Sequence, residues 1–100
     1  MGFFTPQTAT VNIDTDNCIT VRKLTFGEFS DIMDRHPDMN ERKFGFDLVR
    51  TAILSWDGQG FEGRPVSAEN INALPWEVIA VLVPVVADLN TVSDAVEGKA

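Results

Sequence analysis

The chain has 100 residues, of which 44% are hydrophobic and 23% are charged, and its formal net charge is −7 at pH 7. This length allows one domain with a modest core and excludes a complete dinucleotide-binding domain or a protein kinase. The acidic balance disfavours partners that require a broad basic surface, so we expect neither a nucleic acid nor an anionic membrane as a partner. The single cysteine, Cys18, excludes an intrachain disulfide and a zinc site built on paired cysteines.

Residues 1–8 are expected to form a flexible leader. In residues 9–24, apolar residues alternate with polar ones on both sides of the turn-forming residues 14–17, which predicts a β-hairpin. Thr25 and Glu28 form a capping box, so a helix is expected to begin at residue 26. Helices are predicted at about 26–36, 40–56, 68–73 and 75–96, followed by a tail at 98–100.

The predicted fold class is therefore mainly α. It is a single helical domain spanning residues 9–97, with three to four helices and a short N-terminal β-hairpin. The helix at 40–56 is predicted because apolar residues recur at intervals of three and four, as Phe46, Val49, Ile53 and Trp56.

The last helix is the most apolar part of the chain. Residues 78–87 are apolar on all sides, but this run is too short for a bilayer span, which needs about 20 residues. Such a helix is either buried or covered in part by a partner. Because Trp is enriched where interfaces are strongest, we predict a partner-binding surface near this helix. Its predicted members are Trp56, Trp76, Val78, Val81, Leu82, Val85 and Leu89.

Gly58, Gly60 and Gly63 match the G-x-G-x-x-G string of phosphate-binding loops. Such a loop needs a strand before it and a helix that opens at the third glycine. The segment before Gly58 has helical periodicity, and Pro65 follows the string too closely for a helix to begin there. We therefore predict a loop with Gly58 at a helix C-terminus, and no bound cofactor.

Two further candidate sites have ordinary structural interpretations. The acidic turn at 14–17 resembles a calcium loop, but Ile19 and Thr25 stand where an EF-hand needs glycine and glutamate, so no metal site is predicted. His36, the only histidine, precedes Pro37 at a predicted helix C-terminus, where histidine is a common capping residue. No nucleophile or catalytic carboxylate is indicated beside it, and we expect no enzymatic activity.

Several short patterns follow one another in a fixed order. They are a V-R-x-L-T-x-x-E segment, a Trp-Asp pair, and a closing helix that starts with Leu-Pro and ends near Leu-Asn. The residues are Val21, Arg22, Leu24, Thr25 and Glu28, then Trp56 and Asp57, then Leu74 and Pro75, and last Leu89 and Asn90. Across about residues 18–92 the chain resembles the tail assembly chaperones of long-tailed bacteriophages and related prophages.

The resemblance implies a small, mostly helical, non-enzymatic protein that binds the tape measure protein while the tail tube polymerises around it. It also implies a frameshift-extended form that recruits the tail tube protein. Such proteins act in the cytoplasm of the infected or lysogenic host and are absent from the mature virion. A homo-oligomer formed through the apolar helix is a further expectation. The main alternative is a small structural virion component, such as a connector or tail completion protein, and a nucleotide-dependent enzyme and a bacterial regulatory adaptor are the others.

Overall fold

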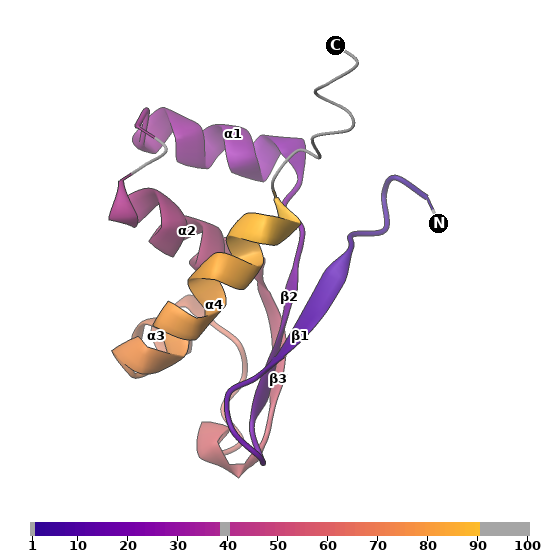
Figure 1. Ribbon diagram of the computed structural model, residues 1–100, viewed down its shortest axis with the longest axis vertical. Coiled ribbons are helices and arrows are strands. Elements are labelled where there is room, and N and C mark those ends of the chain that lie inside the picture. Colours follow the sequence, from indigo (N-terminus) through magenta and orange to yellow (C-terminus); the bar gives the residue numbers. More distant parts are fainter. Residues whose placement is uncertain (1, 39–40, 91–100) are drawn as a thin grey trace.

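The computed structural model describes residues 2–38 and 41–90 (Figure 1). In chain order the elements are β1 (Thr8–Asn12), β2 (Cys18–Arg22), α1 (Phe26–Arg35), α2 (Arg42–Ala52), β3 (Ile53–Asp57), the short 3₁₀ helix η1 (Gln59–Phe61), α3 (Ala68–Asn72) and α4 (Trp76–Leu89). Of the described residues, 49% are helical and 17% are in strands. The predicted mainly α class with a short hairpin is therefore wrong, because the strands form a three-stranded antiparallel sheet in the order β1-β2-β3.

The third strand replaces the end of the helix predicted at 40–56. Helix α2 ends at Ala52, and Ile53 leaves it with extended dihedrals, φ −64° and ψ 117°. In β3, Trp56 lies opposite Ile19 and Ile53 lies opposite Val21 in β2, with a register irregularity between these pairs. The hairpin edge thus gives backbone partners to a segment whose β-branched and aromatic residues also favour a strand. The predicted start of this helix at residue 40 lies outside the described residues.

The remaining predicted elements have counterparts in the structure. The predicted hairpin corresponds to β1 and β2, although β1 begins at Thr8, inside the predicted leader. The helices expected at 26–36 and 68–73 correspond to α1 and α3. Helix α4 begins at Trp76, one residue after the predicted start. Its predicted end at 96 and the predicted tail at 98–100 lie outside the described residues.

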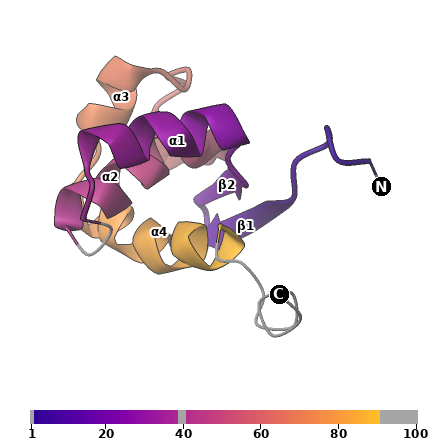
Figure 2. The same ribbon diagram turned by 90° about the horizontal axis from the view of Figure 1, so that it is seen from above.

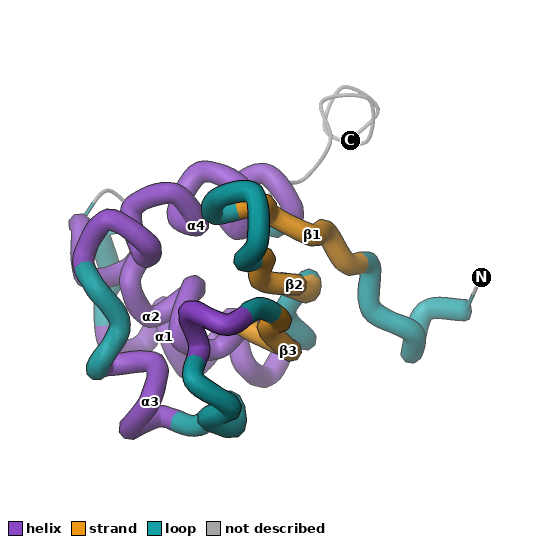
Figure 3. Tube along the Cα trace, turned by 90° about the horizontal axis from the view of Figure 1, so that it is seen from below, coloured by secondary structure: helices purple, strands orange, loops and turns teal. Residues whose placement is uncertain are grey.

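All the long helices lie on one side of the sheet (Figures 2 and 3). Helix α4 packs against α2 and crosses β1 and β2, and α1 packs against α2. The core between these layers is formed by Ile19, Val21, Ile32, Phe44, Leu48, Val49, Ala52, Ile53, Phe61, Ile71, Leu82 and Val86. Full burial of one such aliphatic or aromatic side chain contributes about 1.5–3 kcal/mol, so this layer supplies most of the driving force for folding.

The opposite face of the sheet carries a row of hydroxyl side chains. Thr10, Thr20 and Ser55 form a row across the three strands, and the hydroxyl groups of Thr10 and Thr20 are 3.0 Å apart. Threonine favours a strand through its branched Cβ without requiring burial. This row of hydroxyl groups therefore favours strand formation without a second layer of helices.

Candidate functional site

The glycine string follows a strand, not a helix, so the prediction of Gly58 as a helix C-cap is wrong. One condition for a phosphate loop is thus met, because β3 ends immediately before Gly58. The other is not, because the next α-helix, α3, starts at Ala68. In addition, the backbone N–H of Gly60 donates to the Asn17 side-chain oxygen at 2.8 Å. The amide that a phosphate would need is therefore already bound within the protein.

The hairpin turn explains why glycines stand in this loop. A Cβ on Gly60 would come within 2.8 Å of the Asn17 side chain, and Gly58 has a φ of +133° that side chains rarely allow. Asn17 is itself fixed by Asp14, whose carboxylate accepts its side-chain amide at 2.9 and 3.0 Å. These bonds lower the pKa of Asp14. Because Gly58 and Gly60 have no side chain, the tip of the β1–β2 hairpin can pack against this loop.

Asp14 in the acidic turn and His36 both have structural contacts with described residues. Within residues 2–38 and 41–90, no group of three or more His, Cys, Asp or Glu side chains could hold a metal ion. His36 caps the C-terminus of α1, and its ring nitrogens lie 2.7 Å from the Asp47 carboxylate and 3.4 Å from Glu41. Partial burial raises the pKa of Asp47, but hydrogen bonds from His36 and Arg50 outweigh it and lower that pKa. This cluster ties α1 to α2.

The two tryptophans of the predicted surface lie in different places. Trp56 stacks on Phe61 with ring centroids 4.9 Å apart, and its indole N–H donates to the Arg64 carbonyl at 2.7 Å. Trp56 therefore holds the glycine loop against the sheet. Trp76 lies at the start of α4 with 57% of its surface exposed. Each tryptophan lines a separate pocket, and Leu74 lines both pockets.

The remaining predicted members, all in α4, differ in how far they are buried. Leu82 is fully buried, and Val78, Val85 and Leu89 pack against the core. Val81 is 44% exposed. The predicted apolar surface is therefore mostly the inner side of α4, and Trp76 and Val81 are its members that are most available to a partner.

Trp76 lines a pocket between α2, α3 and α4. Its volume is about 260 Å³. Phe46 and Trp76 form its wall, with ring centroids 5.3 Å apart and planes at 83°. The complete lining is Phe46, Val49, Arg50, Ile71, Asn72, Leu74, Trp76 and Ile79.

A cationic helix face adjoins this pocket. Arg42, Phe46 and Arg50 are spaced by four residues and share one side of α2, and Lys43 lies beside them. At the pocket rim, Arg50 donates to Asn72 at 3.0 Å and to Asp47 at 2.8 Å. Sequence reasoning missed this pocket because it assigned Phe46 to the core face of α2. The spacing of Arg42, Phe46 and Arg50 was the signal that could have revealed it.

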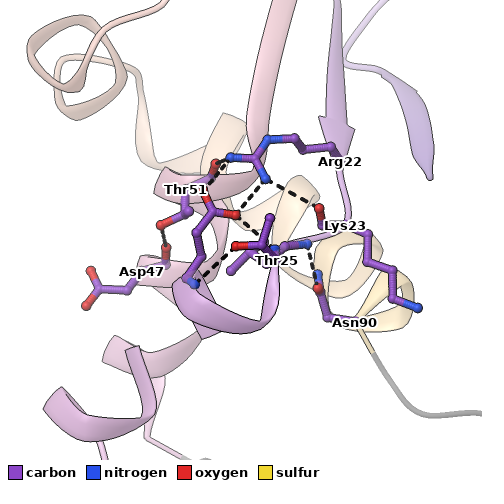
Figure 4. Close-up of polar contacts among 8 residues, drawn as sticks. Arg22, Lys23, Thr25, Asp47, Thr51 and Asn90 are labelled. Atoms are coloured by element: carbon purple, nitrogen blue, oxygen red, sulfur yellow. Dashed lines mark hydrogen bonds and ion pairs between the residues drawn. The ribbon is translucent and has the colours of Figure 1, made fainter. Parts of the chain in front are cut away.

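A second polar cluster joins β2 to α1 (Figure 4). The Arg22 guanidinium binds both carboxylate oxygens of Glu28 at 2.8 Å. Glu28 also accepts the Thr25 backbone N–H at 2.9 Å, and the Thr25 hydroxyl accepts the Glu28 N–H, which completes the predicted capping box. The Arg22 hydrogen bond is the main reason why the pKa of Glu28 falls from 4.5 to about 2.

The same cluster reaches α2 and α4. Arg22 donates to the Thr51 carbonyl at 3.2 Å, so its positive charge lies at the C-terminus of α2, where the helix dipole is negative. The Asn90 side chain accepts the Leu24 backbone N–H at 2.9 Å and donates to the Val86 carbonyl at 2.8 Å. We call Arg22, Leu24, Thr25, Glu28 and Asn90 the polar junction, and all five belong to the sequence patterns described above.

Comparisons with known proteins found no match: no protein family, curated protein or solved structure is significantly similar to this chain. Among the residues that the structure describes, no helix is both long enough and apolar enough to cross a membrane.

Proposed function

We propose that the protein is a non-enzymatic phage tail assembly chaperone that binds the tape measure protein and helps the tail tube to polymerise. The observation that carries this proposal is the polar junction. Residues that are far apart in the resembling patterns, such as Arg22 and Asn90, lie in one hydrogen-bonded cluster. A pattern whose members contact one another favours a shared fold over a chance similarity of short strings.

The pocket supports a role in binding. It offers a large exposed aromatic side chain, Trp76, and the same side of α2 that lines the pocket carries Arg42 and Lys43, which have no ion pair with a described residue. Large exposed aromatic side chains are typical of interface hot spots. The tail tube protein would be a second partner, recruited by a frameshift-extended form. The protein would act in the cytoplasm of the infected or lysogenic host.

The test is co-expression of the tagged chain with the tape measure protein of the same genome, followed by affinity purification and light scattering. We expect a soluble complex with a client that is insoluble by itself. The proposal is wrong if the client is soluble without the chain and the chain elutes free of it. Mass spectrometry of purified particles separates the main alternative, because a connector or completion protein would be present in them and a chaperone would not.

A further inference from the structure

We propose that the pocket between α2, α3 and α4 binds an acidic amphipathic helix of a protein partner. This inference deepens the proposed function, on which it rests, because it defines the chemistry of the client segment. A bulky apolar side chain of that helix would enter the pocket against Phe46 and Trp76, and carboxylates beside it would face Arg42, Lys43 and Arg50.

The size of the pocket favours a protruding side chain over a free small molecule. Its volume of about 260 Å³ lies below the range of about 300–1,000 Å³ that is usual for small-molecule sites. The two rings at its wall meet edge to face, and Trp76 is 57% exposed. A tryptophan ring that is half exposed gains further burial when an apolar group enters, and this is the usual anchor of a helix-in-groove complex.

The walls favour a helical partner over an extended one. Most of the pocket lining comes from helices, and its members Phe46 and Val49 lie inside α2, where the backbone groups are bonded within the helix. These walls therefore offer few backbone donors or acceptors to a partner, which must satisfy its own backbone hydrogen bonds, and a helix does so.

Charge decides which amphipathic helix fits. The protein carries a formal charge of −7, yet the exposed face of α2 presents Arg42, Lys43 and Arg50 around Phe46. Asp47 neutralises part of the charge of Arg50, whereas Arg42 and Lys43 have no ion pair with any residue in the described ranges. The nearest acidic side chain along α4 is Glu77, next to Trp76. A helix with carboxylates beside its apolar stripe would supply the missing counter-charges.

The test uses two synthetic amphipathic peptides of about 18 residues, long enough to be helical on binding. They share one leucine stripe, and their polar faces carry glutamate in one and lysine in the other. Fluorescence anisotropy measures the binding of each to the full chain. We expect the glutamate peptide to bind more tightly, and Trp76→Ala to weaken it about 30-fold, as for an interface hot spot. Trp76 is largely exposed, so this variant is expected to fold.

Charge reversal supplies the matched comparison. The double variant Arg42→Glu with Lys43→Glu should weaken the glutamate peptide about tenfold, because two attractions become repulsions. The control is Lys23→Glu with Arg64→Glu, which changes the net charge equally at exposed positions outside the pocket. It should change the affinity less than about twofold, since neither side chain lines the pocket and exposed charges are screened by salt.

Four results would overturn the inference, three of them without the client. The first is binding of the glutamate peptide that is weakened equally by both double variants, and the second is preference for the lysine peptide at a site sensitive to Trp76→Ala. The third is self-association of the free chain that Trp76→Ala abolishes, which would identify a second copy as the occupant. Co-purification of the tape measure protein with the Arg42→Glu and Lys43→Glu variant, as well as wild type, would retain the chaperone function and exclude this site. Binding of the glutamate peptide without capture of the tape measure protein would retain this site and contradict the chaperone function.

Discussion

Arg22 and Arg42 have the same side chain in opposite surroundings. The Arg22 side chain is 20% exposed, binds both oxygens of Glu28 and donates to the Thr51 carbonyl. Arg42 is exposed at the start of α2 and has no ion pair with a described residue. A paired, half-buried cation stabilises the fold, and its removal leaves carboxylate and carbonyl oxygens without a partner. An exposed, unpaired cation adds little to stability and is available for binding.

The comparison of Leu82 with Val81, two consecutive residues of α4, gives the largest expected effect. Leu82 is fully buried, so Leu82→Ala should lower the free energy of unfolding by about 3 kcal/mol, through lost burial and a cavity. Val81 is 44% exposed, and Val81→Ala should change the free energy of unfolding by less than about 0.5 kcal/mol. Urea unfolding followed by circular dichroism measures both. Equal losses for the two variants would mean that Val81 is covered, for example by a second copy of the chain.

The polar junction gives the next largest effect, and it depends on pH. Folding lowers the pKa of Glu28 from 4.5 to about 2, so the ionised form is favoured in the folded protein. The resulting stability is fully present above about pH 4.5 and is lost as the pH falls towards 2. Glu28→Gln should therefore cost on the order of 2 kcal/mol at pH 7 and progressively less at lower pH.

Urea unfolding of wild type and Glu28→Gln at several pH values between 7 and 3 measures this difference. Other carboxyl groups titrate equally in both proteins, so the difference isolates Glu28. A gap that stays constant across this range would show that Glu28 is not stabilised by its charge. Arg22→Lys is a matched control, because lysine retains the charge and loses the two-pronged contact.

The contact between the hairpin turn and the glycine loop should have a smaller effect. Asn17→Ala removes the bond to the Gly60 N–H and should cost about 1 kcal/mol. Gly60→Ala places a Cβ within 3.0 Å of three atoms of the Asn17 side chain and should also destabilise the protein. The double variant should lose less than the sum of the two, because the clash disappears with the side chain. Additive losses in chemical denaturation would contradict the contact.

The elements that sequence reasoning placed well are those with local causes. The capping box of Thr25 and Glu28 lies within four residues, and the alternation that marks the hairpin lies within a single stretch of chain. Strand β3 was missed because its signal is not local. The apolar spacing of Phe46, Val49 and Ile53 is compatible with a helix that continues past residue 52 and with one that ends there. Whether residues 53–57 form a helix or a strand depends on pairing with β2, which lies more than 30 residues earlier in the sequence.

The candidate site shows the same limit. The sequence marked Trp76 as a residue for binding, but it grouped it with Leu82, which is buried. A helix that is apolar on all sides does not indicate which side faces the core, since its hydrophobic pattern has no preferred direction. That choice is made by α2 and the sheet, against which α4 packs.

The smallest expected effect is the sharpest test of the contrast between Arg22 and Arg42. Arg42→Gln and Lys43→Gln, singly or together, should change the free energy of unfolding by less than about 0.5 kcal/mol, because neither side chain has an ion pair to lose with a described residue. Arg22→Gln should cost about 2 kcal/mol under the same conditions, because it leaves Glu28 and the Thr51 carbonyl without their donor. A large loss at Arg42 would show that the cationic face of α2 serves folding. Its unpaired charges would then be no argument for a partner.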